Sequence, residues 1–394
     1  MKASQKLSKA AVVGAGNMGS GIAQKIATEG VDVILVDTTE EQAQTGKKRI
    51  ATLLQEGVER GVFAAPQVQE ILNRVTPSGD LGSLEDVDVV VEAVFEDLDI
   101  KKHLFGRLDA TCRRDTILAT NTSSFLVEDL AASTAHPERV IGLHYFYHPA
   151  KNRLVEVVGH STSDAAVLAQ AWRFQERIGK TPIASADAPG FVVNRFFVPW
   201  LNESVRLHEE GHAIATIEAA AKQALGIGMG PFELMNVTGV PITLHAANAL
   251  AAKLGDFYQA AASIAKQVES KQSWELLGRV DETKFSVIQE RLWGVIFHIS
   301  LKLASEKVGT LEDTDIGARV GLRWPVGPFE KMNAMGFAET ARLCGLVQNA
   351  YTYRNSTVCP TAKKDALFYA AGTARCDARH GDHYHQSPRP AQRP

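Results

Sequence analysis

Short apolar runs alternate with longer amphipathic stretches through the first half of the chain. The runs cover residues 9–13, 31–36, 87–94, 117–120, 139–143 and 154–158. Strands that are buried on both faces have continuous apolar sequences, and helical stretches between them are typical of parallel pairing. The pattern therefore predicts an α/β domain built on a doubly wound parallel sheet.

The first run leads into a glycine-rich turn. Residues 14–19 read Gly-Ala-Gly-Asn-Met-Gly, which matches G-x-G-x-x-G, and a helical stretch follows that closes at Gly30. The first glycine of such a turn permits the tight bend, the second lets a pyrophosphate approach, and the third lets the helix pack on the strand. The helix N-terminus offers free N–H groups and a positive dipole end to phosphates. The candidate cofactor contacts here are Gly14, Gly16, Asn17, Met18 and Gly19.

An acidic residue, Asp37, ends the second apolar run. Its carboxylate can accept hydrogen bonds from a ribose diol and would repel a 2′-phosphate. We therefore predict a Rossmann-type domain that binds NAD rather than NADP. FAD is the alternative, and the later motifs disfavour it.

A run of basic residues, 47–49, lies in the next helical stretch, and Arg60 follows further on. A run of charges on a helix is usually a solvated face. Contact with a phosphate-bearing substrate is the other interpretation, and the sequence alone leaves both open.

Polar residues also follow the apolar runs at 87–94 and 117–120. Glu96 and Lys101 come after the first, and residues 121–124, Asn-Thr-Ser-Ser, come after the second. Loops at the carboxyl ends of parallel strands face the ligand, so Glu96 and Lys101 are candidates to lie by the nicotinamide half of the cofactor. A helix-capping acid and a surface lysine are the alternative. Capping by a serine would account for only part of the polar cluster at 121–124.

A histidine and a glutamate belong to the last two runs. His144 directly follows residues 139–143, and Glu156 lies within 154–158. A carboxylate beside an imidazole holds one tautomer and stabilises the charged ring after it takes a proton. Such a pair is more often structural when it stands alone. Its place among polar strand ends makes it a candidate general base with an orienting partner.

The second half of the chain is helical by pattern, beginning after Pro189-Gly190. Residues 230–239 return in similar form as 327–336, and residues 214–226 parallel 311–321. We expect an all-α region with two tandem helical modules and a connector from about 251 to 286. The expected domains are an NAD-binding domain at 1–187, the first module with its connector at 188–286, the second module at 287–372 and a disordered tail at 373–394.

Taken together, these motifs resemble the L-3-hydroxyacyl-CoA dehydrogenase family, in family order over about residues 8–240. The matching segments are 14–19, Asp37, 94–98, 121–124, 142–144, 154–157, 189–195 and 230–234. Short members of that family carry one helical module and commonly dimerise through it. This chain is similar to the dehydrogenase part of the longer fatty-acid β-oxidation multifunctional enzymes, which carry two.

The resemblance implies reversible NAD-dependent oxidation of an L-3-hydroxyacyl-CoA to the 3-oxoacyl-CoA. It makes His144 the general acid and base, an imidazole having an ordinary pKa near neutrality, and Glu156 its orienting partner. Ser123 and Asn194 would contact the reacting oxygen. The family's cofactor contacts map to Glu96, Lys101 and Ser123, and its basic CoA contact maps loosely to Arg60.

Several positions depart from the family pattern. The family usually reads His-Phe-Phe-Asn-Pro, whereas residues 144–149 read His-Tyr-Phe-Tyr-His-Pro. Tyr147 therefore stands where the family has an asparagine near the nicotinamide, and His148 replaces the proline. Lys151 and Arg153 in the same loop are either solvated cations or the receptor for a distal carboxylate on a dicarboxylic acyl-CoA.

The second module has no equivalent of Asn194, because Gln289 or Glu290 stands nearby. We therefore expect this module to be non-catalytic. It could instead cover the apolar surface that a single module would bury in a dimer. A monomer with pseudo-dimeric modules and a homodimer both remain open.

Composition excludes several classes of protein. The chain has 394 residues, with 45% hydrophobic and 22% charged, which is ordinary for a globular protein. A formal net charge of −3 gives no basic field for nucleic acid or an anionic membrane. No apolar run approaches the roughly 18 residues of a membrane span. We therefore expect acyl-CoA as the partner, with neither nucleic acid nor membrane.

The expected location is the cytoplasm. The residues before the first strand are too few for a signal peptide, and the four cysteines are scattered, which suits a reducing compartment and argues against zinc. No specific metal site is expected. Three tail histidines, His380, His383 and His385, could bind metal adventitiously.

Two other functions are compatible with parts of the pattern. One is an NAD-dependent dehydrogenase for a hydroxy acid without CoA, such as a sugar acid. The other is an NAD-binding structural protein of the lens-crystallin kind. The joint presence of His144, Glu156, Ser123 and Asn194 argues against the second, because a protein without catalysis has no need of all four.

Overall fold

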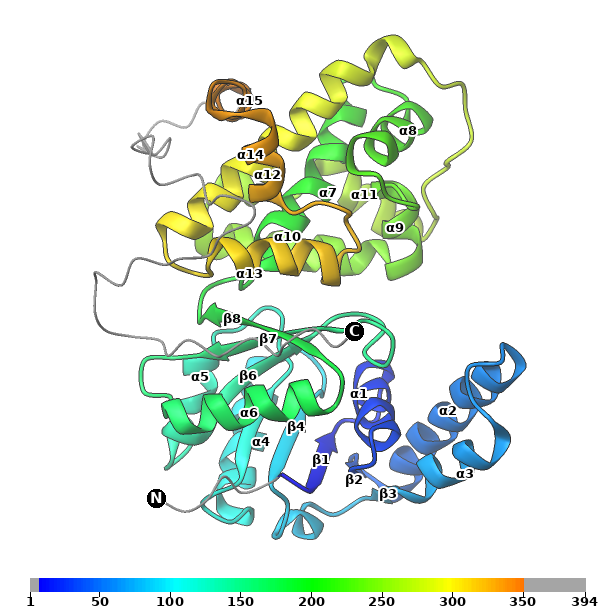
Figure 1. The fold of residues 1–394 in the computed structure, drawn as a ribbon, viewed down its shortest axis with the longest axis vertical. Helices are drawn as coiled ribbons and strands as arrows, with labels where there is room; N and C mark the ends of the chain where they lie inside the picture. Colours follow the sequence, from blue (N-terminus) through cyan, green and yellow to red (C-terminus); the bar gives the residue numbers. More distant parts are fainter. Residues whose placement is uncertain (1–6, 351–394) are drawn as a thin grey trace, which may run out of the picture.

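A computed structural model describes residues 7–350 of the chain. An α/β part with one sheet is followed by a helical region, and Figure 1 shows the helical region above the sheet. The tail at 373–394, with its three histidines, lies outside the described residues. No helix within residues 7–350 has the length and apolar character needed to cross a membrane.

The sheet has eight strands in the order β3-β2-β1-β4-β5-β6-β7-β8. Neighbours pair in parallel, except that β6 and β7 are antiparallel. The predicted parallel sheet is thus confirmed, with its last two strands reversed. The strands are β1 (Lys9–Val13), β2 (Asp32–Val36), β3 (Val75–Ser78), β4 (Val89–Glu92), β5 (Ile117–Thr120), β6 (Val140–Tyr145), β7 (Leu154–Gly159) and β8 (Thr181–Ala186).

Helices cover both faces of the sheet, which explains why its strands are apolar throughout. Side chains alternate between the faces of a strand. In β1, Ala10 and Val12 pack into a core with helices α1, α2, α3 and α6, whereas Ala11 and Val13 pack into another with α4 and α5. These helices are α1 (Asn17–Thr28), α2 (Glu40–Glu59), α3 (Ala65–Asn73), α4 (Leu98–Thr111), α5 (Val127–Ala131) and α6 (Ala165–Arg177).

The helical region contains the predicted repeat. The first copy runs from α7 to α10 and the second from α12 to α15. The segment expected as a connector is partly helical, because α10 extends to Leu254 and α11 follows it. The helices are α7 (Val193–Glu209), α8 (Ile214–Leu225), α9 (Pro231–Thr238), α10 (Val240–Leu254), α11 (Ala262–Ser270), α12 (Phe285–Ser305), α13 (Leu311–Ile316), α14 (Pro328–Met335) and α15 (Phe337–Ala350), with a π-helical turn at Gly317–Gly321 after α13.

The repeated Gly-Pro-Phe-Glu sequence has a structural cause. In the first copy, Glu218 of α8 accepts hydrogen bonds from the N–H groups of Phe232 (2.6 Å) and Glu233 (3.3 Å) at the start of α9. A carboxylate at a helix N-terminus satisfies free N–H groups and interacts favourably with the dipole. A Cβ on Gly230 would lie 2.3 Å from the Glu218 carboxylate, so only glycine lets the acid come this close.

The second copy repeats this arrangement. Asp315 accepts from the N–H groups of Phe329 (2.8 Å) and Glu330 (3.1 Å) at the start of α14. A Cβ on Gly327 would lie 2.3 Å from the Asp315 carboxyl group. The two copies therefore share their internal hydrogen bonds as well as their sequence.

The two copies face each other through α7 and α12. Arg195 of α7 forms an ion pair with Glu306, the residue that follows α12. Arg291 of α12 forms one with Glu210, the residue that follows α7 (3.1 Å). Along the chain, Arg195 and Glu210 are separated by the same number of residues as Arg291 and Glu306. This reciprocity is that of an isologous contact between two similar units.

The second copy also contacts the sheet. The N–H of Ala186, at the end of β8, donates to the carbonyl of Val308 (2.7 Å). The side-chain amide of Asn152, which lies just before β7, donates to the carbonyl of Gly321 (2.9 Å). A Cβ on Gly321 would lie 2.4 Å from the Leu154 side chain. The contacts place the second copy against β7, which carries Glu156, and against the neighbouring strand β8.

We predict that Arg291→Met lowers the free energy of unfolding by about 2–4 kcal/mol, because Glu203, buried in α7, would lose its hydrogen bond from Arg291 (2.8 Å). Urea unfolding of both proteins measures the difference. Arg319→Met is the matched control: its ion pair with Glu330 is exposed, so a loss below about 1 kcal/mol is expected. Equal losses for the two variants would show that the contact between Arg291 and the buried Glu203 adds no more stability than an exposed ion pair.

Candidate active site

His144 and Glu156 face each other across β6 and β7, where they are register partners. The Nδ1 atom of His144 lies 2.5 Å from Oε2 of Glu156, and both side chains are buried. The imidazole also packs on two rings, Phe146 (4.7 Å between centroids) and Phe191 (5.5 Å). The ring is thereby held in one orientation, with Nδ1 directed at the carboxylate.

The second oxygen of Glu156 binds the start of the helical region. Oε1 accepts hydrogen bonds from the N–H groups of Val192 (3.0 Å) and Val193 (2.9 Å) at the start of α7. Gly190 and Phe191 precede them with positive φ angles of 76° and 49°. This left-handed turn directs the two N–H groups at the carboxylate.

Asn194, the second residue of α7, lines a pocket between the α/β part and the helical region. Ser123 and Ser124 line the pocket from the loop after β5. The structure thus brings the predicted Ser123 and Asn194 together on one pocket, and the Glu156 contact fixes the start of Asn194's helix beside His144. The remaining lining residues are Pro189, Gly190, Val198, Ala246, Ala249 and Leu250.

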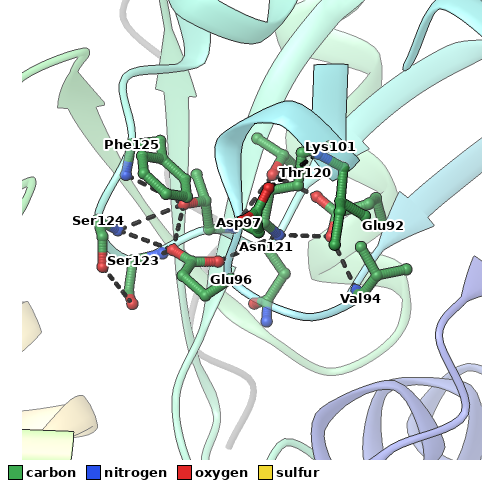
Figure 2. Close-up of polar contacts among 12 residues, drawn as sticks. Glu92, Val94, Glu96, Asp97, Lys101, Thr120, Asn121, Ser123, Ser124 and Phe125 are labelled. Atoms are coloured by element: carbon green, nitrogen blue, oxygen red, sulfur yellow. Dashed lines mark hydrogen bonds and ion pairs between the residues drawn. The ribbon is translucent and has the colours of Figure 1, made fainter. Parts of the chain in front are cut away.

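The loop that carries Ser123 is fixed by Glu96, as Figure 2 shows. One carboxylate oxygen of Glu96 accepts from the Thr122 hydroxyl (2.5 Å) and from the N–H groups of Ser123 and Ser124 (3.1 Å each). The other lies 3.1 Å from Nζ of Lys101. Burial raises the pKa of Glu96, but Lys101 and these hydrogen bonds outweigh it and hold the pKa below its ordinary value.

Lys101 is buried between two carboxylates. Besides Glu96, its Nζ donates to Glu92 (2.5 Å), whose other oxygen accepts from the Thr120 hydroxyl (2.7 Å). Figure 2 shows the lysine between the two acids. Lys101 is therefore no surface lysine, and its contacts in the structure go to Glu92 and Glu96. Glu92 has a place in this network that the sequence analysis did not assign.

The glycine-rich turn fits a dinucleotide. Gly14 has a φ of 103°, and a Cβ there would lie 2.4 Å from the Ala93 carbonyl. No atom lies within 4 Å of a Cβ on Gly16, so the turn is open to a ligand at that point. No side chain caps α1, which leaves its first N–H groups available for phosphates. Asp37, the residue after β2, accepts a hydrogen bond from the N–H of Ala15 (2.7 Å) within the turn.

The basic run on α2 is not a uniformly solvated face, which corrects that interpretation. Arg49 donates to the carbonyl of Ala15 (2.7 Å) inside the glycine-rich turn and contacts the Ser20 hydroxyl (3.3 Å). Lys47 donates to the carbonyl of Val75 (2.7 Å), and only Lys48 is exposed. Two hydrogen bonds therefore fix the turn at Ala15: its N–H donates to Asp37, and its carbonyl accepts from Arg49.

Lys180 stabilises the loop that follows His144. This buried lysine donates to the carbonyls of Pro149 and Asn152, the latter at 2.7 Å, and burial lowers its pKa to about 7. Tyr147 is exposed, and Lys151 and Arg153 are exposed in the same loop. Arg60 is exposed at the end of α2, 3.9 Å from Glu56.

Comparisons with known proteins agree with this arrangement. The NAD-binding domain of 3-hydroxyacyl-CoA dehydrogenase matches residues 9–188 as a family model, and the C-terminal domain of the same enzymes matches residues 190–285. The chain belongs to the 3-hydroxyacyl-CoA dehydrogenase family. NAD is accordingly the cofactor of its N-terminal domain, and the chain is an enzyme of the oxidoreductase class.

Individual members of the family resemble the chain over different lengths. The chain is 36% identical to 3-hydroxybutyryl-CoA dehydrogenase of Clostridioides difficile over 70% of this chain and 98% of that protein. It is 31% identical to the fatty acid oxidation complex subunit alpha of Shewanella amazonensis over 88% of this chain, and spans about half (54%) of that protein.

A solved structure supports the fold. The crystal structure of 3-hydroxybutyryl-CoA dehydrogenase from Escherichia coli K12 superposes with a TM-score of 0.81, covering 89% of this chain and 96% of that one. The sequences are 24% identical. The match covers 89% of this chain, so the likeness of fold extends into the helical region.

The sequence analysis did not assign three residues of the site, and only one of them could have been found from the sequence pattern. Glu92 interrupts an apolar strand, and a charge at a buried position requires a partner. Arg49 stood in a basic run that gave no hint of its partner. His245 of α10, whose Nε2 lies 3.2 Å from the Ser124 hydroxyl, stood in an alanine-rich helix without any distinguishing pattern.

We predict that Arg49→Met weakens NADH binding by about 10-fold, because a charged donor to the Ala15 carbonyl would be lost from the turn. Fluorescence titration with NADH measures the dissociation constant. Lys48→Met is the matched control, since it removes an exposed charge from the adjacent position, and an unchanged constant is expected. If both variants weaken binding equally, the general charge of α2 and not the Arg49 contact determines affinity.

Proposed function

We propose that the protein oxidises L-3-hydroxyacyl-CoA to 3-oxoacyl-CoA with NAD, and catalyses the reverse reduction. The observation that carries this proposal is the buried pair of His144 Nδ1 and Glu156 Oε2 at 2.5 Å, next to the helix that carries Asn194. Family membership supplies the class of reaction, and the geometry supplies a base, an orienting carboxylate and two polar groups for an oxygen.

In the proposed reaction, His144 uses Nε2, because Nδ1 is engaged by Glu156. It takes the proton of the substrate's 3-hydroxyl group, and Glu156 stabilises the imidazolium that forms. Ser123 and Asn194 bind the reacting oxygen and stabilise charge on it. NAD, held by the glycine-rich turn and Asp37, would supply the acceptor for the hydride that leaves C3. In the reverse direction the protonated His144 returns its proton to that oxygen.

The remaining site residues have supporting roles in this proposal. Gly14, Gly16, Asn17, Met18, Gly19 and Asp37 hold the dinucleotide, with Glu96, Ser123 and, through Glu96, Lys101 beside the nicotinamide half. Arg60, exposed at the end of α2, is free to meet the phosphates of CoA. The name of the Clostridioides relative makes the four-carbon acyl group the first to test.

We also propose the chain organisation. Residues 1–187 form the NAD domain, 188–286 the first module, and 287–372 the second module, which is non-catalytic. The reciprocal ion pairs of Arg195 and Arg291 support a second module that takes the place of a partner subunit. The proposed location remains the cytoplasm.

We predict that the protein oxidises NADH in the presence of acetoacetyl-CoA, followed as the loss of absorbance at 340 nm. His144→Ala is expected to lower turnover by a factor on the order of 10²–10⁴, because the reacting oxygen loses its proton donor. NADH titration of the variant is the control and should give an unchanged dissociation constant. Absence of turnover in the natural protein, with NADH still bound, would count against the proposed substrate. A hydroxy acid without CoA would then be tested next.

We predict further that light scattering of the full chain gives the mass of a single chain, because the second module covers the face of α7 that a second subunit would otherwise cover. Measurement over a range of protein concentrations separates a monomer from a weak dimer. A dimer that persists on dilution would show that another surface mediates assembly.

A further inference from the structure

A hydrogen bond joins the helical region to Ser124, which lines the pocket. Nε2 of His245, an exposed residue of α10, lies 3.2 Å from the hydroxyl of Ser124. The Ser124 hydroxyl in turn lies 3.4 Å from that of Ser123. Figure 2 shows the two serine hydroxyls directed at one another. A continuous chain of polar groups thus leads from His245 to the serine proposed to bind the reacting oxygen.

The backbone of the Ser123 loop is fixed by hydrogen bonds to Glu96, whereas the Ser123 hydroxyl can still rotate. The N–H groups of Ser123 and Ser124 are both held by Glu96. Among residues 7–350, the Ser123 hydroxyl has Ser124 as its hydrogen-bond partner and no other. A hydroxyl group rotates to suit its neighbours, so the direction of its proton depends on this contact.

The position of His245 is suited to controlling that direction. The next residue on α10, Ala246, lines the pocket together with Asn194 of α7. In the second copy, Arg342 occupies the place in α15 that His245 occupies in α10, and it lies 3.0 Å from Glu290, the counterpart of Asn194. The two positions are thus in contact in the second copy, and in the first copy the residue next to His245 shares the pocket with Asn194.

We propose that His245 is a positioning residue for the reaction, acting through Ser124 on Ser123. Nε2–H of His245 donates to the Ser124 hydroxyl, Ser124 donates to Ser123, and Ser123 directs its own proton at the reacting oxygen. Hydrogen bonds arranged in one direction strengthen one another. This inference rests on the proposed function, because it concerns the oxygen that Ser123 binds there.

The test measures acetoacetyl-CoA reduction by NADH in the full chain and in four variants: His245→Ala, His245→Gln, Ser124→Ala and the double variant His245→Ala with Ser124→Ala. His245→Ala should lower kcat about 3- to 10-fold, the effect of one hydrogen bond, with the dissociation constant of NADH and Tm unchanged. Gln carries an N–H donor, so His245→Gln should restore most of kcat. The double variant should lose no more than the larger single loss, because both remove the same chain of hydrogen bonds.

The control is His103→Ala, which removes an exposed histidine from α4 and should leave kcat unchanged. Three outcomes would overturn the inference while the natural protein is active: an unchanged kcat in His245→Ala, losses that multiply in the double variant, or a loss of kcat accompanied by weaker NADH binding and lower Tm. A natural protein without turnover would overturn the proposed function itself, and this inference with it.

Discussion

The buried carboxylate of Glu156 is the contact on which the site depends. One oxygen binds His144, and the other accepts two N–H groups at the start of α7. A carboxylate without water requires such partners, since an unpaired buried charge is strongly destabilising. The same group therefore orients the imidazole and joins the sheet to the helix that carries Asn194. Any shift of α7 against β7 would therefore disturb His144 and the helix of Asn194 together.

Carboxylates that accept two successive backbone N–H groups recur through the molecule. Glu96 accepts the N–H groups of Ser123 and Ser124, and Asp187 accepts those of Val127 and Glu128 at the start of α5 (2.8 Å each). Glu218 and Asp315 do so for α9 and α14. Each acid lies outside the loop or helix start that it holds and binds two successive N–H groups. Charge-assisted bonds of this kind are stronger than neutral ones, so the loops at the pocket are held as firmly as regular elements.

The sequence predicted most of the sheet and the central pair of the site, and the failures have physical causes. Continuous apolar runs identified six strands, but the edge strand β3 includes Pro77 and is half exposed, and β8 alternates between buried and exposed residues. Register could be anticipated for His144 and Glu156 because adjacent strands carry them. Arg49 and His245 could not be assigned, because their partners, Ala15 and Ser124, become neighbours only after tertiary packing.

The repeat shows how one structural unit serves two purposes. Glu290 directly precedes Arg291 just as Asn194 directly precedes Arg195, and the reciprocal ion pairs identify the two arginines as counterparts. In the first copy the corner between the two long helices holds Asn194 on the pocket and His245 against Ser124, which also lines it. In the second copy the same corner holds Glu290 and Arg342 in an ion pair. These complementary charges satisfy each other, so the two side chains bind one another rather than a substrate, which suits this corner to supporting the first.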